Sequence, residues 1–211
     1  VLCLVGSEMC IRDRINRNYS LAARLMLGKS VGDRPQKFFL GGNSQMMIFS
    51  DTQTEGRDDS GFYAQRVLDY DNTSILEDVY FSEYVFPLRG ARYRERVGEN
   101  VAVANFEFRF PFVNYVDVSF PARIRFGNIF GHLFVDVGAA WDSSDEFNNS
   151  ELVRNKYGLT DPEASPILTT FGIGTKIFTP FALIRIDTAW DKYPSGGYSK
   201  PQYIISFGYD W

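Results

Sequence analysis

The segment Val101–Val113, VAVANFEFRFPFV, constrains the fold of this chain more than any other stretch. Its residues alternate between an apolar face with four phenylalanines and a polar face with Glu107 and Arg109. Because successive side chains of a strand point to opposite faces, this period of two predicts a β-strand. In a water-soluble sandwich the phenylalanine face would be buried. In a transmembrane β-barrel that face would meet lipid and the charges would point into the lumen. The segment alone leaves both interpretations open.

Five further segments show similar alternation, and together with the first they predict an all-β fold. They are residues 18–29, 123–141, 168–178, 181–191 and 202–211. The first of these contains good helix formers, but its period of two favours a strand. Strands of about ten residues cross a bilayer when they are tilted. We predict about six antiparallel strands from the C-terminal part of a transmembrane β-barrel, with further strands upstream because closed bacterial barrels have at least about eight.

The composition limits the classes of function. A net charge of −4 argues against nucleic acid as a partner, and no apolar run is long enough for a transmembrane helix. We expect no enzyme, cofactor or metal site, and interpret the single histidine, His132, as a hydrogen-bonding residue of the inner face. Residues 142–165 include DSSDEFNNSE, but Phe147 stands where a calcium loop needs glycine. We therefore predict a solvated loop there.

The first fourteen residues, VLCLVGSEMCIRDR, differ from the rest of the chain. They resemble a translated adaptor of the kind that contaminates metagenomic genes. A secretory signal is the alternative, because residues 1–5 are apolar. That stretch is short, lacks a basic region before it and is interrupted by Glu8, so we favour the adaptor. On this interpretation Cys3 and Cys10 are foreign, and residues 15–211 are the C-terminal part of a longer barrel protein.

Residues 31–99 separate the predicted strands as a long inserted loop. Gly41 and Gly42 predict a tight bend, and residues 74–84 have the capping-box pattern of a short helix. The loop ends in residues 86–98, FPLRGARYRERVG, which combine a glycine with several charges. A charged segment between membrane-type strands needs polar surroundings, and a barrel lumen provides them.

Four segments, in this order, resemble the C-terminal barrel of the outer-membrane assembly-factor and two-partner-secretion superfamily, also called the bacterial surface antigen family. FFLGGNS resembles the Gly-Gly segment before the family's inserted loop, and PLRGARY resembles its loop-tip motif. NFEFRFPF and FVDVGAAWD resemble two of its strands, the second written F-x-D-x-G-x-x-W in the family. The resemblance covers residues 16–211 and implies a barrel of about 16 strands in the intact protein.

The resemblance also implies roles for individual residues. Arg89 and Gly90 match the loop-tip motif, although Ala91 stands where many members have an aromatic residue. In the family this loop folds into the lumen, so Arg89 is expected to bind Glu107 and Asp136 on the inner wall. From the residues alone, the alternative is that Glu107 pairs with charges on neighbouring strands.

The implied function is protein insertion or translocation by an integral barrel of the bacterial outer membrane. Expected partners are outer-membrane lipid, client or secreted polypeptides, and the outer-membrane assembly machinery. Phe207, Tyr209 and Trp211 resemble the C-terminal signal that this machinery recognises. A barrel that anchors an upstream Tol-like β-propeller or patatin-type lipase is one alternative, because the long insertion and the PQKFFLGG segment resemble the propeller-linked barrels. A soluble β-rich binding domain is another.

Overall fold

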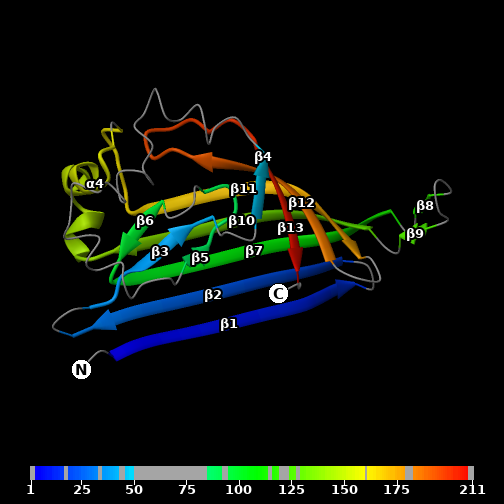
Figure 1. Ribbon diagram of the computed structural model, residues 1–211, viewed down its shortest axis with the longest axis horizontal. Helices are drawn as coiled ribbons and strands as arrows, with labels where there is room; N and C mark the ends of the chain where they lie inside the picture. The colour runs from blue at the N-terminus through cyan, green and yellow to red at the C-terminus, as the bar shows by residue number, and fades with distance from the viewer. Residues whose placement is uncertain are drawn as a thin grey trace.

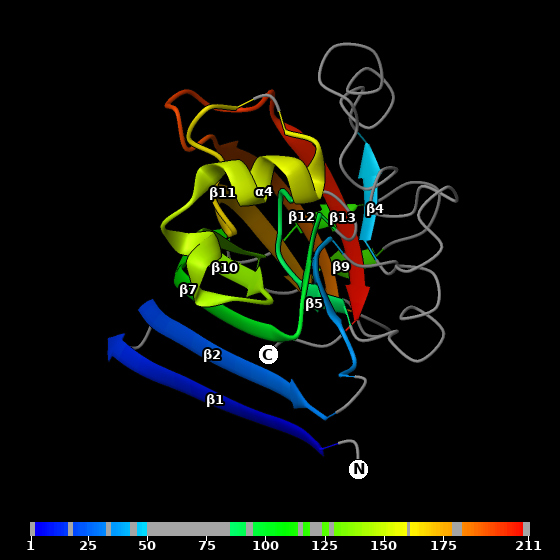
Figure 2. The same cartoon turned by 90° about the vertical axis from the view of Figure 1, so that its left-hand side faces the viewer.

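The computed structural model describes residues 3–16, 19–32, 35–42, 46–49, 85–91, 95–113, 116–118, 124–126, 129–159, 161–178 and 183–208. Its main element is an antiparallel sheet of eight strands (Figure 1). Their order is β1 (Cys3–Asn16), β2 (Tyr19–Val31), β7 (Asn100–Val113), β10 (Ile129–Trp141), β11 (Ile167–Phe178), β12 (Leu183–Lys192), β13 (Gln202–Gly208) and β4 (Met46–Phe49). Figure 2 shows this sheet curling from β1 round to β4. The prediction of an all-β partial barrel is confirmed, with the six predicted strands present as β2, β7 and β10–β13.

The two faces of the sheet have the polarity of a membrane barrel. Large apolar side chains on the outer face are about half exposed, among them Leu21, Phe106, Leu133, Ile173, Ile186 and Tyr203. The inner face buries charged and polar side chains, among them Asn105, Glu107, Arg109, His132, Asp136, Lys176, Arg185 and Asp187. A water-soluble sheet has the opposite arrangement, because it buries its apolar face. This distribution disfavours the soluble interpretation.

Three short strands of the inserted loop form a second sheet against the concave face. They are β3 (Phe38–Gly41), β5 (Val85–Pro87) and β6 (Arg96–Gly98), with β3 in the middle, parallel to β5 and antiparallel to β6. Their apolar side chains join inner-face residues of β2, β7, β10 and β11 in one buried cluster. It comprises Met26, Phe38, Leu40, Phe86, Leu88, Ala91, Val101, Val103, Ala140 and Leu168. The predicted helix at residues 74–84 lies outside the described residues.

The prediction of a solvated loop at residues 142–165 was wrong. A 3₁₀ helix, η1 (Ser144–Phe147), is followed by helix α4 (Ser150–Tyr157). The missed signal is the capping box of Ser143 with Glu146 three residues later, whose reciprocal bonds satisfy backbone N–H groups at the helix start. Asn149 caps α4 in a similar way.

A second correction concerns the predicted strand at residues 123–141. The described strand β10 begins at Ile129, and the preceding segment β9 (Ile124–Phe126) instead pairs with β8 (Val116–Val118) in a separate hairpin. Strand β1 pairs with β2 over nearly its whole length, from Cys3 opposite Val31 to Asn16 opposite Tyr19. The assignment of residues 1–14 to an adaptor, and of residues 31–99 to one inserted loop, stays a prediction.

Candidate functional site

The loop tip consists of residues 88–91, which follow β5 and turn against the inner face of the sheet. Leu88 donates its backbone N–H to the carbonyl of Gly41 at 2.8 Å, which joins the tip to the end of β3. Leu88 is fully buried, and in β10 a Cβ on Gly138 would lie only 3.2 Å from its Cδ1 atom. The same Cβ would lie 2.9 Å from Cδ1 of Leu40, so glycine at position 138 makes room for both β3 and the tip.

The conformation of the tip depends on Gly90. Its φ of +80° lies in the left-handed region of the backbone, which residues other than glycine rarely adopt. A Cβ at this position would also lie 2.7 Å from the Cβ of Ala189 on β12. Both the backbone angle and the close approach to the wall therefore require glycine.

Gly41 and Gly42, the two glycines predicted to form a bend, lie where β3 ends. Gly41 has a φ of +147° and is the last residue of β3, while Gly42 follows it; both are buried. The Gly41 carbonyl accepts the Leu88 bond, so the bend and the tip are in direct contact although more than forty residues separate them.

The guanidinium of Arg89 contacts two carboxylates of the sheet. Its Nε and Nη2 donate to Asp136 Oδ2 and Oδ1 at 2.7 and 2.8 Å, and its Nη1 donates to Glu107 Oε2 at 3.0 Å. Arg89 is 4% exposed, Glu107 1% and Asp136 0%. The planar fork of arginine suits such two-pronged binding, and charge-assisted bonds of this kind are stronger than neutral ones.

An aromatic ring completes the environment of Arg89. The guanidinium carbon lies 3.8 Å from the centre of the Phe134 ring, a distance at which the ring face attracts a cation. A Cβ on Gly172 of β11 would lie 2.5 Å from the ring atom Cζ of Phe134. Glycine at position 172 therefore leaves the space that this ring occupies.

Glu107 is shared between the loop and the wall. Besides Arg89, it accepts hydrogen bonds from Arg109 Nε at 2.5 Å and from Lys176 Nζ. One oxygen of Glu107 therefore binds the loop, and the other binds cations of its own strand β7 and of β11, which lies beyond β10 in the sheet. Sequence reasoning missed Lys176, Phe134 and Gly172, although all three lie on the inner face in their strands.

His132 and Asp187 form a second buried contact on the inner face. His132 Nε2 lies 2.8 Å from Asp187 Oδ1, across the intervening strand β11. A Cβ on Gly174, which lies between them, would be 2.0 Å from Asp187 Oδ1. Glycine at position 174 therefore leaves the space across which the two side chains contact each other. The expected location of His132 on the inner face agrees with its complete burial.

The C-terminal signal residues lie only partly within the described chain. Phe207 is in β13, opposite Ile184 of β12. Tyr209 and Trp211 lie outside the described residues. Among the residues that the structure covers, no group of His, Cys, Asp or Glu has the arrangement needed to hold a metal ion. In the same part of the chain, no helix has the length and apolar character required to cross a membrane.

Comparison with known proteins identifies the family. The sequence-family model of the Omp85 superfamily domain matches residues 14–210, which is almost the whole chain. No curated protein matches it. Proteins of this superfamily reside in the outer membrane and act in protein insertion, assembly and translocation, without enzymatic chemistry. The chain has the antiparallel partial barrel expected of that superfamily. We conclude that this chain belongs to the Omp85 superfamily, the bacterial surface antigen family.

Proposed function

We propose that this chain is part of a barrel that inserts or translocates other polypeptides at the bacterial outer membrane, with its inserted loop held in the lumen by Arg89. The observation that carries the proposal is the buried contact of Arg89 with Asp136 and Glu107. A buried charge that loses its partner costs several kcal/mol, so the tip should stay where both carboxylates are.

The proposal is tested by Arg89→Ala in the full-length protein, with outer-membrane levels of other barrel proteins as the readout. We expect those levels to fall, because the tip loses the contact that holds it. Arg154→Ala, at a partly buried position on helix α4, is the matched control and should leave these levels unchanged. Normal client levels with Arg89→Ala, at equal amounts of the mutant barrel, would contradict the proposal.

The second candidate is a barrel that anchors an upstream domain, such as a Tol-like β-propeller or a lipase. The length of the inserted loop between Gly42 and Leu88 favours it, because assembly factors close this gap in a few residues. The two candidates differ after depletion of the protein. An assembly or translocation barrel should cause loss of other outer-membrane or secreted proteins, whereas an anchor should cause loss only of its own attached activity.

We further propose that Phe207, Tyr209 and Trp211 form the signal by which the assembly machinery recognises this chain as its own substrate. The aromatic residues at the alternate positions 207, 209 and 211 support this proposal. Deletion of Trp211 should lower the amount of this protein in the outer membrane. Outer-membrane levels equal to those of the unchanged protein would remove the proposal.

A further inference from the structure

The return limb of the inserted loop, residues 95–100, runs from the tip back to β7 and contains β6. Strand β6 pairs with β3, where Val97 lies opposite Phe39. The backbone N–H of Val97 donates instead to the hydroxyl of Tyr157 at 3.2 Å, and the same hydroxyl donates to the carbonyl of Val97 at 2.7 Å. One side chain therefore satisfies both backbone groups of a buried strand residue.

Tyr157 is held rigidly for this role. It is the last residue of α4, is fully buried, and packs with Phe39, Val97 and Val153. The helix ends directly after it at Gly158, whose φ of +63° is the left-handed conformation typical of such ends. Removal of the hydroxyl would leave two buried backbone groups without this partner, which is costly because water cannot replace it.

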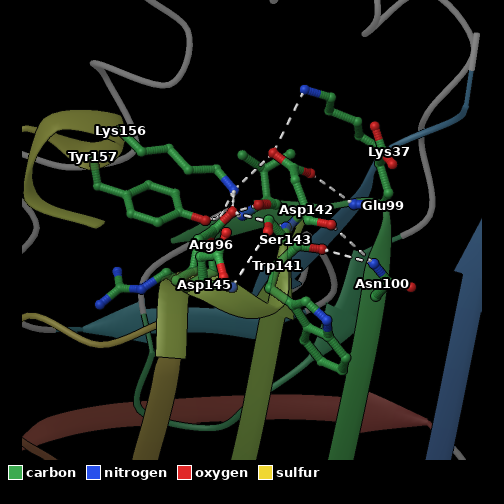
Figure 3. A network of polar contacts seen from close by, with 12 residues as sticks. Lys37, Arg96, Glu99, Asn100, Trp141, Asp142, Ser143, Asp145, Lys156 and Tyr157 are labelled. Carbon is green, nitrogen blue, oxygen red and sulfur yellow. Dashed lines mark hydrogen bonds and ion pairs between the residues drawn. The ribbon is translucent and has the colours of Figure 1, made fainter. Parts of the chain in front are cut away.

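The polar contacts on both sides of Val97 also connect the return limb to the cap, residues 142–164. Glu99 donates its N–H to Asp142 Oδ1 at 3.0 Å, and Asp142 Oδ2 lies 2.9 Å from Lys156 Nζ. On the other side, the Arg96 guanidinium carbon lies 4.9 Å from the centre of the Tyr157 ring. Figure 3 shows Asp142 with Lys156 and Glu99 on either side of it, and Tyr157 beside Arg96.

The backbone of the return limb also lies very close to the backbone of β10, which again indicates that the limb is held against the cap. A Cβ on Gly98 would lie 2.3 Å from the backbone nitrogen of Trp141, at the end of β10. Because any larger residue would push the limb away from the wall, position 98 is suited only to glycine. Backbone approach, hydroxyl bonds and carboxylate contact therefore all fix the return limb against the segment that begins at Trp141.

We propose that Tyr157 is a positioning residue that forms a second anchor for the inserted loop, separate from the anchor at Arg89. The cap then determines where the return limb lies, and Arg89 determines where the tip lies. Displacement of the loop from the lumen requires release of both. This inference rests on the proposed lumenal role of the loop, but the contacts of Tyr157 can be tested independently of client insertion.

The test compares two cysteine probes in outer-membrane vesicles that contain the full-length protein. Val97→Cys reports on the return limb and Ala91→Cys on the tip, each in a protein without any other cysteine; Val97 and Ala91 are 5% and 1% exposed. Tyr157→Phe should raise the labelling rate of the Val97 probe by an impermeant maleimide about tenfold and leave the Ala91 probe within about twofold, because two hydrogen bonds are lost at the limb alone. Tyr198→Phe, at an exposed tyrosine, is the matched control.

The outcomes separate this inference from the proposed function. Arg89→Ala should expose the Ala91 probe and leave the Val97 probe protected. If Tyr157→Phe and the control Tyr198→Phe give the same labelling rate at the Val97 probe, the second anchor is overturned. It is also overturned if Tyr157→Phe exposes the Val97 and Ala91 probes equally. Normal client levels with Arg89→Ala would instead count against the proposed function. If Tyr157→Phe prevents folding, hydrogen exchange of the unsubstituted protein decides: the Val97 amide should exchange as slowly as the amides of β7, and rapid exchange overturns the proposal.

Discussion

At the scale of single residues, the two acids that bind Arg89 differ in their other partners. Asp136 binds Arg89 through both oxygens, whereas Glu107 also binds Arg109 and Lys176. Loss of the Glu107 charge therefore removes an anion that three buried cations contact, whereas loss of the Asp136 charge removes one that Arg89 contacts. The wall and the loop are coupled through Glu107.

We therefore predict that Glu107→Gln destabilises the barrel more than Asp136→Asn does. Breaking a buried ion pair on one side costs about 3–5 kcal/mol, and Glu107 takes part in several such pairs. The midpoint of urea unfolding, followed by the heat-modifiable shift on gels, measures both variants. An equal or smaller loss for Glu107→Gln would show that the Lys176 and Arg109 contacts contribute little.

Gly90 gives a second prediction at this scale. Gly90→Ala should destabilise the tip by about 1–3 kcal/mol, because a side chain is strained at positive φ. The added Cβ also approaches Ala189. Combining it with Ala189→Gly should recover part of the loss, since this removes the contact but not the strain. Full recovery would mean that the backbone angle is unimportant.

At the scale of elements, helix α4 and its ion pairs hold the return limb at one end of the sheet. Burial alone would lower the pKa of the Lys156 ammonium, but Tyr157 and the carboxylates of Asp142 and Glu146 outweigh this effect and raise it well above its ordinary value. A cation whose folded pKa is raised contributes stability that is complete below its unfolded pKa and is lost as the pH rises through its folded pKa.

The sign of this shift gives a pH prediction. The stability difference between the unchanged protein and Lys156→Met should be constant from neutral pH to about pH 10, and should shrink only above the ordinary lysine pKa of about 10.4. Urea unfolding at a series of pH values measures it. A difference that stays constant above about pH 10.4 would show that Lys156 has no raised pKa.

The elements also show what sequence reasoning could and could not reach. Period-two alternation was sufficient for β2, β7 and β10–β13, because one face of each strand is predominantly apolar. It missed η1 and α4, because the polar composition of this segment concealed the capping residues Ser143 and Asn149. It also missed Lys176, since no local pattern indicates which inner-face cation a distant carboxylate will bind.

At the scale of the whole molecule, the inverted polarity of the sheet defines its environment. Aromatic pairs lie at both ends of β10, with Trp141 against Phe147 of η1 at one end and Phe130 against Phe178 of β11 at the other. The resemblance supplied Arg89, Glu107 and Asp136 as related residues, and the structure gives their distances. Their role in assembly stays a prediction, because geometry alone does not identify a client.

The outer face gives a prediction for the whole barrel. Leu133→Arg, at a half-exposed outer-face position in the middle of β10, should reduce membrane insertion and cost about 2–4 kcal/mol if it lies near the bilayer centre. Leu152→Arg, at an equally exposed position on α4, is the control and should have little effect. Folding into lipid vesicles, titrated with urea, measures both, and equal behaviour of the two variants would contradict a lipid-facing β10.

The coupling energy between Arg89 and Asp136 tests the central claim most directly. A double-mutant cycle with Arg89→Ala, Asp136→Ala and the double variant, measured by urea unfolding in lipid vesicles, isolates the interaction of the pair. The account predicts a coupling of at least about 1 kcal/mol, as expected for buried charges in direct contact. Additive effects of the two substitutions would show that the loop tip is not held in the lumen by this contact.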